Sequence, residues 1–127
     1  KFDSLIQIGR PHLQDAPPIQ LGPVISGWRY MPARCETLLY ASQKHLLNLA
    51  IGGTAVGTGI TAPPAFGDPV AHYLSEHTGY PFVSSETNFP ALTAHDEVVQ
   101  LHGTLQALAG DLMKLANAVR WMASGPR

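Results

Sequence analysis

The sequence predicts an all-α fold, a bundle of long helices, from two apolar patterns and the composition. Toward the C-terminus, apolar residues alternate steps of four and three over four heptads, which is typical of a long helix packed along other long helices. A second stretch, Val24 to Ala50, shows three-and-four spacing as well. Of the 127 residues, 45% are apolar and only 13% are charged, about half the usual charged share. Much of the surface is therefore expected to face other protein, with helices packing across subunits.

The N-terminal stretch is predicted to end in a loop. Lys1 to Ile8 fits the tail of a helix or an extended lead-in. Gly9 to Ala16, reading GRPHLQDA, should be non-helical, because Pro11 fixes its own φ and pushes the preceding residue toward an extended conformation. We expect a rigid loop, held by later helices, that presents His12. Functional groups are often placed on such loops.

The first long helix is predicted over Val24 to Ala50. Pro17 and Pro18 prevent a helix from beginning before about Ile19. Pro32 predicts either a kink near Trp28 to Pro32 or a helix that begins only at Pro32, because proline removes one backbone hydrogen bond and crowds the carbonyl four residues earlier. The pattern that predicts this helix comprises Ile25, Trp28, Met31, Cys35, Leu38, Leu39, Ser42, Leu46 and Leu49.

The middle of the chain combines small residues with one short helix. Ala50 to Pro64 is rich in glycine, but it lacks the Gly-Lys-Ser/Thr ending of a phosphate loop. We interpret it as close helix packing or a helix break. Asp68 to Thr78 is predicted to be a helix capped by Asp68 and closed by Gly79, and Tyr80 to Phe89 an irregular connection.

The last helix is predicted over Pro90 to Ala123, with a length of ~50 Å. A second stripe along it lacks bulk and would let another helix come close. One helix with two packing faces needs more partners than this chain supplies, so we expect another subunit to cover one face. The heptad pattern comprises Ala94, Val98, Leu101, Leu105, Leu108, Leu112, Leu115, Val119 and Met122. The second stripe comprises Val99, Gly103, Ala107 and Gly110.

Composition argues against several classes of partner. A net charge of −1 gives no electrostatic footprint for nucleic acid or for an anionic membrane. No apolar run approaches the ~20 residues of a membrane span. The single cysteine, Cys35, excludes an internal disulfide and is interpreted as a small core residue rather than as a nucleophile. We expect a cytoplasmic or mitochondrial-matrix protein.

Most of the histidines fit surface or interface roles. His95 and His102 are predicted to share a helix face, but no third ligand at a suitable spacing supports a metal site there. His45, His72 and His77 are interpreted as surface residues.

His12 differs from the other histidines because of its setting in the loop. Arg10, Gln14 and Asp15 are its close neighbours in the sequence. From the chemistry of these groups, His12 is a candidate to bind a carboxylate or relay a proton near neutral pH; the alternative is a cap or a hydrogen-bond anchor.

Three separated motifs resemble one known family. They read GRPHLQDA, GGTAVGTGITAPP and NFPALTAHDEVVQLHGTLQALAGDLMKLANAVRWMASGPR. In this order and spacing they resemble the class II fumarase branch of the fumarase/aspartase superfamily, from FDSLIQIGR to SGPR. Histidine at position 12 favours fumarase over aspartase, which usually has glutamine there. Argininosuccinate and adenylosuccinate lyases depart further in the later segments.

The resemblance implies a fold, a reaction and a site. It implies a homotetramer whose central domains pool long helices, and reversible hydration of fumarate, a small dicarboxylate, to L-malate without a metal or another cofactor. His12 matches the family's catalytic histidine, which handles the catalytic water and the proton. Each family active site is assembled from segments of three subunits. Pro11 stands where the family has a threonine whose hydroxyl and N–H can face the substrate, and Pro32 is unexpected in a helix that the family keeps long.

The resemblance also implies that residues 1–127 form only part of the central helical domain. The family's mobile loop, GSSxMPxKxN, would follow SGPR, and the other contributing segments would precede Lys1; the C-terminal domain would be absent as well. We therefore expect this chain to have no hydratase activity by itself. Two alternatives stay open: a noncatalytic helical oligomerisation module, and a lyase of the same superfamily with another substrate.

Overall fold

The structure, a computed structural model that describes residues 1–125, is mostly helical and divides into two compact units. Unit 1 comprises Lys1–Thr37 and the described part of Leu105–Arg127, and unit 2 comprises Leu38–Thr104. The prediction of an all-α fold with long helices is confirmed. The structure adds four very short strands, paired into two two-stranded sheets, that the sequence patterns did not predict.

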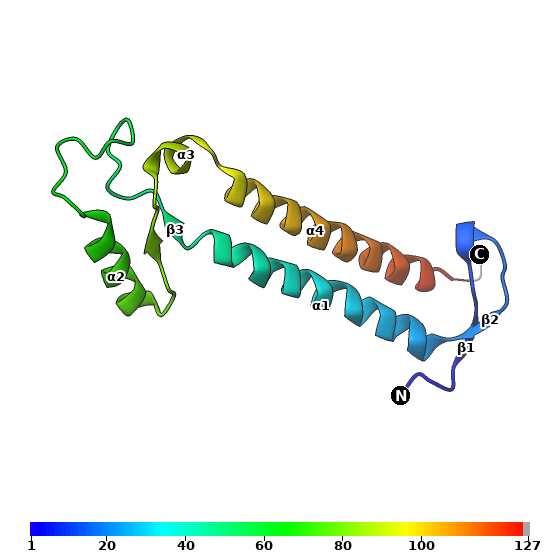
Figure 1. The fold of residues 1–127 in the computed structure, drawn as a ribbon. Helices are drawn as coiled ribbons and strands as arrows, with labels where there is room; N and C mark the ends of the chain where they lie inside the picture. The colour runs from blue at the N-terminus through cyan, green and yellow to red at the C-terminus, as the bar shows by residue number, and fades with distance from the viewer. Residues whose placement is uncertain (126–127) are drawn as a thin grey trace. The chain divides into compact units, whose positions relative to one another are not determined.

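Unit 1 begins with a β-hairpin. Strands β1 (Ile6–Ile8) and β2 (Pro18–Gln20) pair antiparallel, with Ile8 opposite Pro18, and lie beside the start of the first helix (Figure 1). Of the two predictions for Lys1 to Ile8, the extended lead-in is therefore confirmed. The loop between these strands is closed by the hairpin itself rather than by a later helix.

The first long helix, α1 (Leu21–His45), runs without interruption through Pro32. The prediction of a long helix is confirmed, whereas the alternative that it begins at Pro32 is wrong. A single missing N–H does not end a helix whose residues on both sides keep the helical apolar pattern. The helix ends five residues before the predicted Ala50, with Lys44 and His45 in its last turn, where positive charge complements the helix dipole.

The last predicted helix is divided in two. A short helix, α3 (Asn88–Thr93), is separated from α4 (Asp96–Met122) by Ala94 and His95, and Ala94 is extended with φ −92° and ψ 148°. The prediction of one helix over Pro90 to Ala123 is therefore wrong in its first turn. The Thr93 hydroxyl donates to the Phe89 carbonyl at 2.9 Å, which offers that carbonyl a partner outside the helical ladder. Two acidic residues in the first turn of α4 favour the restart.

Fewer than half of the predicted heptad positions of α4 are covered within the described residues. Leu101, Leu108 and Leu115 are half-buried, but Leu105, Leu112 and Val119 are 46%, 51% and 54% exposed. The other half-buried positions of α4 are Thr104, Asp111 and Ala118. The spacing thus predicted the helix correctly, but the side chains nearest α1 alternate between leucine and a smaller or polar residue.

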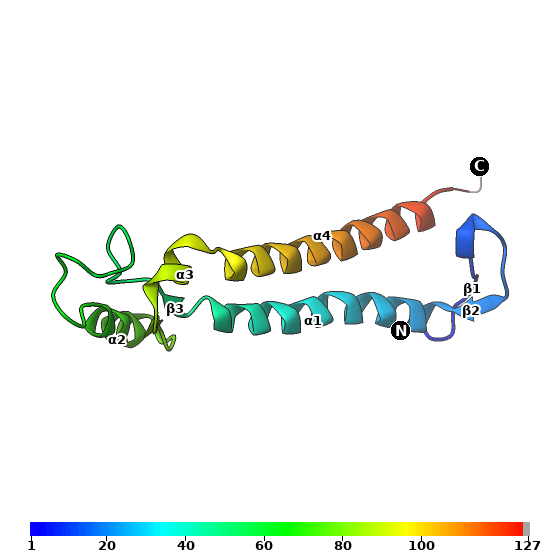
Figure 2. The same ribbon diagram turned by 45° about the horizontal axis from the view of Figure 1, so that its top comes forward.

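Stretches of α1 and α4 lie side by side and antiparallel within each unit (Figure 2). In unit 1 the Cys35 thiol donates a hydrogen bond to Asp111 Oδ2 at 3.3 Å. In unit 2 the hydroxyls of Ser42 and Thr104 lie 3.2 Å apart. Cys35 is only 4% exposed, which confirms that it is a small core residue. The Asp111 carboxylate, by accepting this hydrogen bond, raises the pKa of the Cys35 thiol above its ordinary value of 9.0, and burial adds to the shift.

Unit 2 also contains a βα segment between the long helices. Strands β3 (Asn48–Leu49) and β4 (Val83–Ser84) pair in parallel, and α2 (Gly67–Thr78) lies between them in the sequence. The helix begins after Phe66 rather than at a capping Asp68, so the predicted cap is wrong; Asp68 lies in the first turn instead. Gly79 closes α2 in the left-handed conformation, φ 76°, as predicted.

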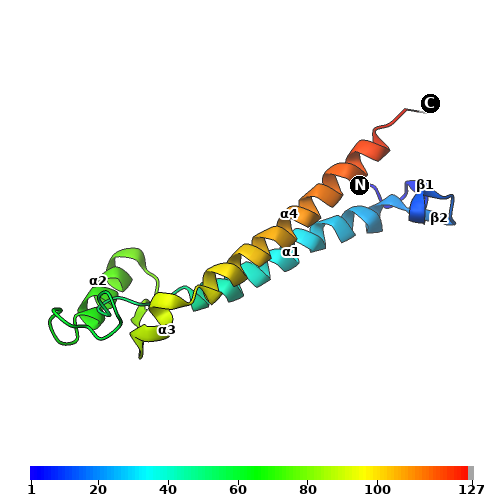
Figure 3. The same cartoon turned by 90° about the horizontal axis from the view of Figure 1, so that it is seen from above.

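The glycine-rich stretch forms an irregular loop beside α2 (Figure 3). It packs closely on α3: a Cβ at Gly53 would lie 2.6 Å from Asn88 Cβ and 2.9 Å from Leu92 Cδ1, and one at Gly57 would lie 3.0 Å from the Phe89 ring. The small residues therefore serve close packing, as predicted.

Buried residues in the described part of the chain are all small. They are Gly9, Gly22, Cys35, Ser42, Gly53, Gly67 and Ala71. Large apolar side chains stay at least partly exposed, including Val99 at 68% and Met113 at 66% on α4. Across residues 1–125, no helix has the length and apolar character needed to cross a membrane.

Gly53→Ala is expected to lower the stability of the fold by about 1–3 kcal/mol, because the added methyl group would overlap Asn88 and Leu92. Gly27→Ala is the matched control: Gly27 lies inside α1, and a methyl group added there would meet no atom within 4 Å, so alanine should raise stability by about 1 kcal/mol. Thermal unfolding followed by circular dichroism compares the two. Equal effects from both substitutions would contradict the packing described here.

Asp111→Asn is expected to lower the pKa of the Cys35 thiol, because the neutral amide no longer penalises the thiolate. Because the thiol has a higher pKa in the folded state than in the unfolded state, it contributes to the stability of the fold. The contribution is fully present at a pH below the unfolded-state pKa, and it is lost as the pH rises through the folded-state pKa. Thiolate absorbance during a titration measures the midpoint, which should lie above 9.0 in the unmodified protein. Asp68→Asn, on α2, should leave it unchanged; an unshifted midpoint in Asp111→Asn would refute the assignment.

Candidate active-site loop

The hairpin loop around His12 is closed at its base by two backbone hydrogen bonds. The Gly9 N–H donates to the Pro17 carbonyl at 3.2 Å, and the Ala16 N–H donates to the Gly9 carbonyl at 2.9 Å. These bonds continue the ladder of β1 and β2. The loop is thus held by its own backbone, and its chain ends are fixed before any side chain contributes.

His12 occupies an unusual backbone conformation at the tip of this loop. Its φ and ψ are 52° and 28°, and Leu13 follows with φ 61°, so two adjacent residues with side chains are left-handed. This conformation costs about 1–2 kcal/mol per residue relative to the right-handed region. His12 is exposed, and within residues 1–125 its ring has no hydrogen-bond or ion-pair partner. The imidazole is therefore free to meet a substrate or a group from another chain.

Pro11, next to His12, contributes backbone shape but no donor. It opens a short 3₁₀ turn over Pro11–Leu13, and its carbonyl accepts the Gln14 N–H at 3.0 Å. Its fixed φ suits the first position of a helical turn. Because proline has neither an N–H nor a hydroxyl, this position can shape the loop but cannot donate a hydrogen bond to a ligand.

Arg10 and Asp15 form an ion pair across the loop. Arg10 Nη1 lies 2.8 Å from Asp15 Oδ1, and the two side chains are 62% and 79% exposed. A pair this exposed contributes at most about 1 kcal/mol to stability. Both residues were expected near His12 from the sequence, but the pair between them was not predicted. The sequence did contain a signal for this pair, because Arg10 and Asp15 carry opposite charges and each lies one residue inside the residues that close the loop, Gly9 and Ala16.

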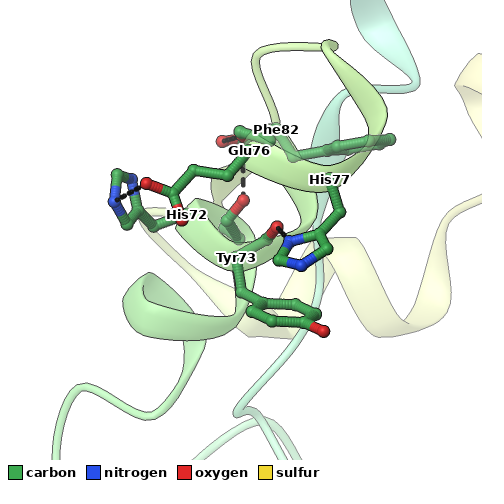
Figure 4. A network of polar contacts seen from close by, with 7 residues as sticks. His72, Tyr73, Glu76, His77 and Phe82 are labelled. Carbon is green, nitrogen blue, oxygen red and sulfur yellow. Dashed lines mark hydrogen bonds and ion pairs between the residues drawn. The ribbon is translucent and has the colours of Figure 1, made fainter.

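The remaining histidines fit local surface roles. On α2, His72 Nε2 lies 3.3 Å from Glu76 Oε1, and the His77 ring donates through Nδ1 to the Tyr73 carbonyl at 2.8 Å and stacks on the Tyr73 ring (Figure 4). These contacts lie within one helix and face solvent. The interpretation of His72 and His77 as surface residues is confirmed.

Metal binding is not indicated by the described residues. Within residues 1–125, no group of three histidine, cysteine, aspartate or glutamate side chains is arranged to hold a metal ion. His95 directly precedes α4, and its carbonyl accepts the Val99 N–H at 3.0 Å, so it lies at the N-terminal cap of the helix, seven residues before His102.

Unit 2 contains two open hollows of its own. One of about 600 Å³ lies between β4 and the start of α4, with Glu86, Asp96 and Glu97 among its lining residues. Another of about 390 Å³ lies between the glycine-rich loop and α2. Near the glycine-rich loop, Thr54 Oγ1 and Asn88 Oδ1 are buried without a hydrogen-bond partner. Among the residues that line these two hollows there is no histidine.

Comparisons with known proteins agree with the resemblance found in the motifs. A family model described as "Lyase" matches residues 1–127. Class II fumarate hydratase from Staphylococcus aureus (strain COL) is 79% identical over all 127 residues, and the chain spans 28% of that relative's length. The final residues of the SGPR motif, Pro126 and Arg127, lie outside the described part of the structure.

Solved structures give the same result at lower identity. A class II fumarase from Schistosoma mansoni superposes with a TM-score of 0.85 and 32% identity over 96% of this chain and 29% of its own. A cobalt-bound fumarate lyase/delta crystallin from Brucella melitensis superposes with a TM-score of 0.91 and 32% identity over 99% of this chain and 27% of its own. From its motifs, its helices and these matches, the chain belongs to the lyase family and is, over its whole length, a close relative of class II fumarate hydratases.

Proposed function

We propose that this chain is a segment of an enzyme that reversibly hydrates fumarate to L-malate, and that it contributes the histidine of a composite active site. The observation that carries the proposal is the presentation of His12 on a closed hairpin loop in a chain 79% identical to a class II fumarate hydratase. Because the chain spans only 28% of that relative, the activity is proposed for a longer protein that contains this segment.

The proposed reaction adds or removes one molecule of water across a carbon–carbon double bond. In the direction of dehydration, a base takes a proton from the carbon next to a carboxylate. The electrons of that C–H bond move into the carboxylate, giving an aci-carboxylate that hydrogen-bond donors stabilise. As the C–OH bond breaks, those electrons form the double bond, and hydroxide leaves as water once it receives a proton.

His12 suits the water-handling part of this reaction. Imidazole can accept or donate a proton near neutral pH, and this one is exposed and has no described partner that occupies its nitrogens. The base that acts on carbon and the donors for the aci-carboxylate would come from other segments, because the residues beside His12 in its loop are the ion-paired Arg10 and Asp15, a proline, a leucine and a glutamine.

We further propose that the protein is a homo-oligomer, a tetramer in the arrangement that the resemblance implies. The support is the face of α4 formed by Leu105, Leu112 and Val119, which this chain leaves about half exposed. Covering such a face removes apolar area from water at roughly 25 cal/mol per Å². Among the expected compartments, we favour the cytoplasm, because the Staphylococcus relative is bacterial.

A noncatalytic oligomerisation module is the second candidate, and Pro11 is the observation that favours it. At the position where the family has threonine, proline supplies neither a hydroxyl nor an N–H. If the chemistry had been lost, the long helices could still assemble. Activity of the longer protein distinguishes the two candidates directly.

His12→Gln in the longer protein is expected to lower kcat by about 10²–10⁴, because glutamine can hydrogen-bond but cannot transfer a proton at neutral pH. Fumarate formed from L-malate is measured by its ultraviolet absorbance. His72→Gln removes an exposed imidazole on α2 and should leave the rate unchanged. Full activity in His12→Gln would exclude the proposed role, and an inactive unmodified protein that still assembles would favour the noncatalytic module.

Pro11→Thr in the longer protein is expected to lower KM for fumarate several-fold, because threonine restores one hydroxyl and one N–H beside His12. Pro11→Ala serves as the matched variant, since alanine restores the N–H but not the hydroxyl. A KM in Pro11→Thr equal to that of the unmodified protein would show that this position does not contact the substrate.

A further inference from the structure

The loop that carries His12 is closed twice, once by backbone and once by side chains. The hydrogen bonds of Gly9 with Ala16 and Pro17 fix its base. One residue further into the loop on each side, Arg10 and Asp15 form the 2.8 Å ion pair. The short segment between these two residues contains His12. The ion pair therefore encloses the candidate catalytic residue.

The backbone closure lowers the entropy cost of forming this ion pair, compared with most exposed pairs. Such pairs usually contribute little, because two long side chains must be ordered and water screens their charges. Here the backbone has already brought both Cα atoms close together, so less freedom remains to be lost. A guanidinium–carboxylate contact at 2.8 Å is also a charge-assisted hydrogen bond. The pair can thus select one loop conformation even where it adds little to global stability.

The enclosed segment needs such a restraint. His12 and Leu13 are both left-handed, with φ of 52° and 61°. Residues other than glycine populate this region sparsely and remain there only where their surroundings enforce it. Within the described residues, the Arg10–Asp15 contact is the polar side-chain interaction of this loop, while the ring of His12 has no partner that could hold it.

We propose that the Arg10–Asp15 ion pair is a clamp that positions His12, holding its backbone left-handed so that the imidazole points toward the substrate. The clamp rests on the proposed function, in which His12 handles the catalytic water. In this arrangement Arg10 is engaged by Asp15 and does not bind a substrate carboxylate itself. Both residues act through His12 and touch no reacting atom.

The test is a charge-swap cycle in the longer protein, assayed with fumarate and L-malate. Arg10→Gln and Asp15→Asn should each lower kcat severalfold, by up to about fivefold, with KM unchanged, because a misplaced catalytic group weakens stabilisation of the transition state and not substrate binding. The double variant Arg10→Asp with Asp15→Arg restores the pair in reverse and should recover most of the lost kcat. Glu76→Gln breaks the exposed pair with His72 on α2 and should change neither constant.

Other outcomes would overturn the clamp. A raised KM with unchanged kcat in Arg10→Gln would mean that Arg10 binds substrate directly, and a swapped variant as slow as the single variants would mean that the pair does not position His12. Unchanged kinetics in both single variants would also refute it. If a single variant fails to assemble, as measured by mass in solution, the swapped variant decides alone by its kcat. His12→Gln distinguishes failure of the proposed function from failure of the clamp. Full activity in His12→Gln would refute both. Loss of activity in His12→Gln, together with full activity in the Arg10 and Asp15 variants, would refute only the clamp.

Discussion

Where the two long helices meet, small and polar residues alternate with half-buried leucines, and the exposure of the remaining apolar positions follows from this contact. Cys35 meets Asp111 in unit 1, and Ser42 meets Thr104 in unit 2. Such side chains let two helices approach closely, but they remove little apolar surface from water. No large apolar side chain among residues 1–125 is buried, and leucines that follow the heptad pattern remain half exposed. A chain built in this way gains most of its hydrophobic stabilisation only when other helices cover it, which is the physical basis of the proposed oligomer.

The candidate active-site loop follows a different principle, because local interactions define it. The hydrogen bonds of β1 and β2, extended through Gly9, close the loop without a long helix. Within it, Pro11 fixes one backbone angle and the ion pair of Arg10 and Asp15 spans the segment that contains His12. Because its own backbone restrains this loop, the loop can hold the imidazole in place while the ring stays exposed. That suits the proposed composite site, in which other segments would supply the rest of the pocket and the histidine would stay accessible to them.

Much of the fold was predictable from local patterns, and the errors have identifiable causes. Apolar spacing located both long helices, and Gly79 marked the end of α2 because only glycine adopts φ 76° at little cost. The break at Ala94 was missed because the apolar repeat continues through it, while the Thr93 hydroxyl and the acidic residues at the start of α4 decide the backbone locally. The hairpin was missed because its strands have three residues each, too short for alternation to be visible. For the candidate site, residue type and loop setting led to the prediction of His12, whereas the Arg10–Asp15 pair could be recognised only from the path of the backbone.

By itself, the sequence determined the helical class, the positions of the long helices, the family and the histidine on which the proposed chemistry depends. These properties follow from periodicity and from motifs, both of which are local along the chain. The tertiary structure decided which part of the heptad pattern faces α1, that Cys35 has a carboxylate partner, and that His12 and Leu13 are left-handed behind an ion pair. Heptad spacing is the same for every partner a helix could choose, so it cannot distinguish a face covered within the chain from one left for another. Only the placement of the second helix resolves that choice.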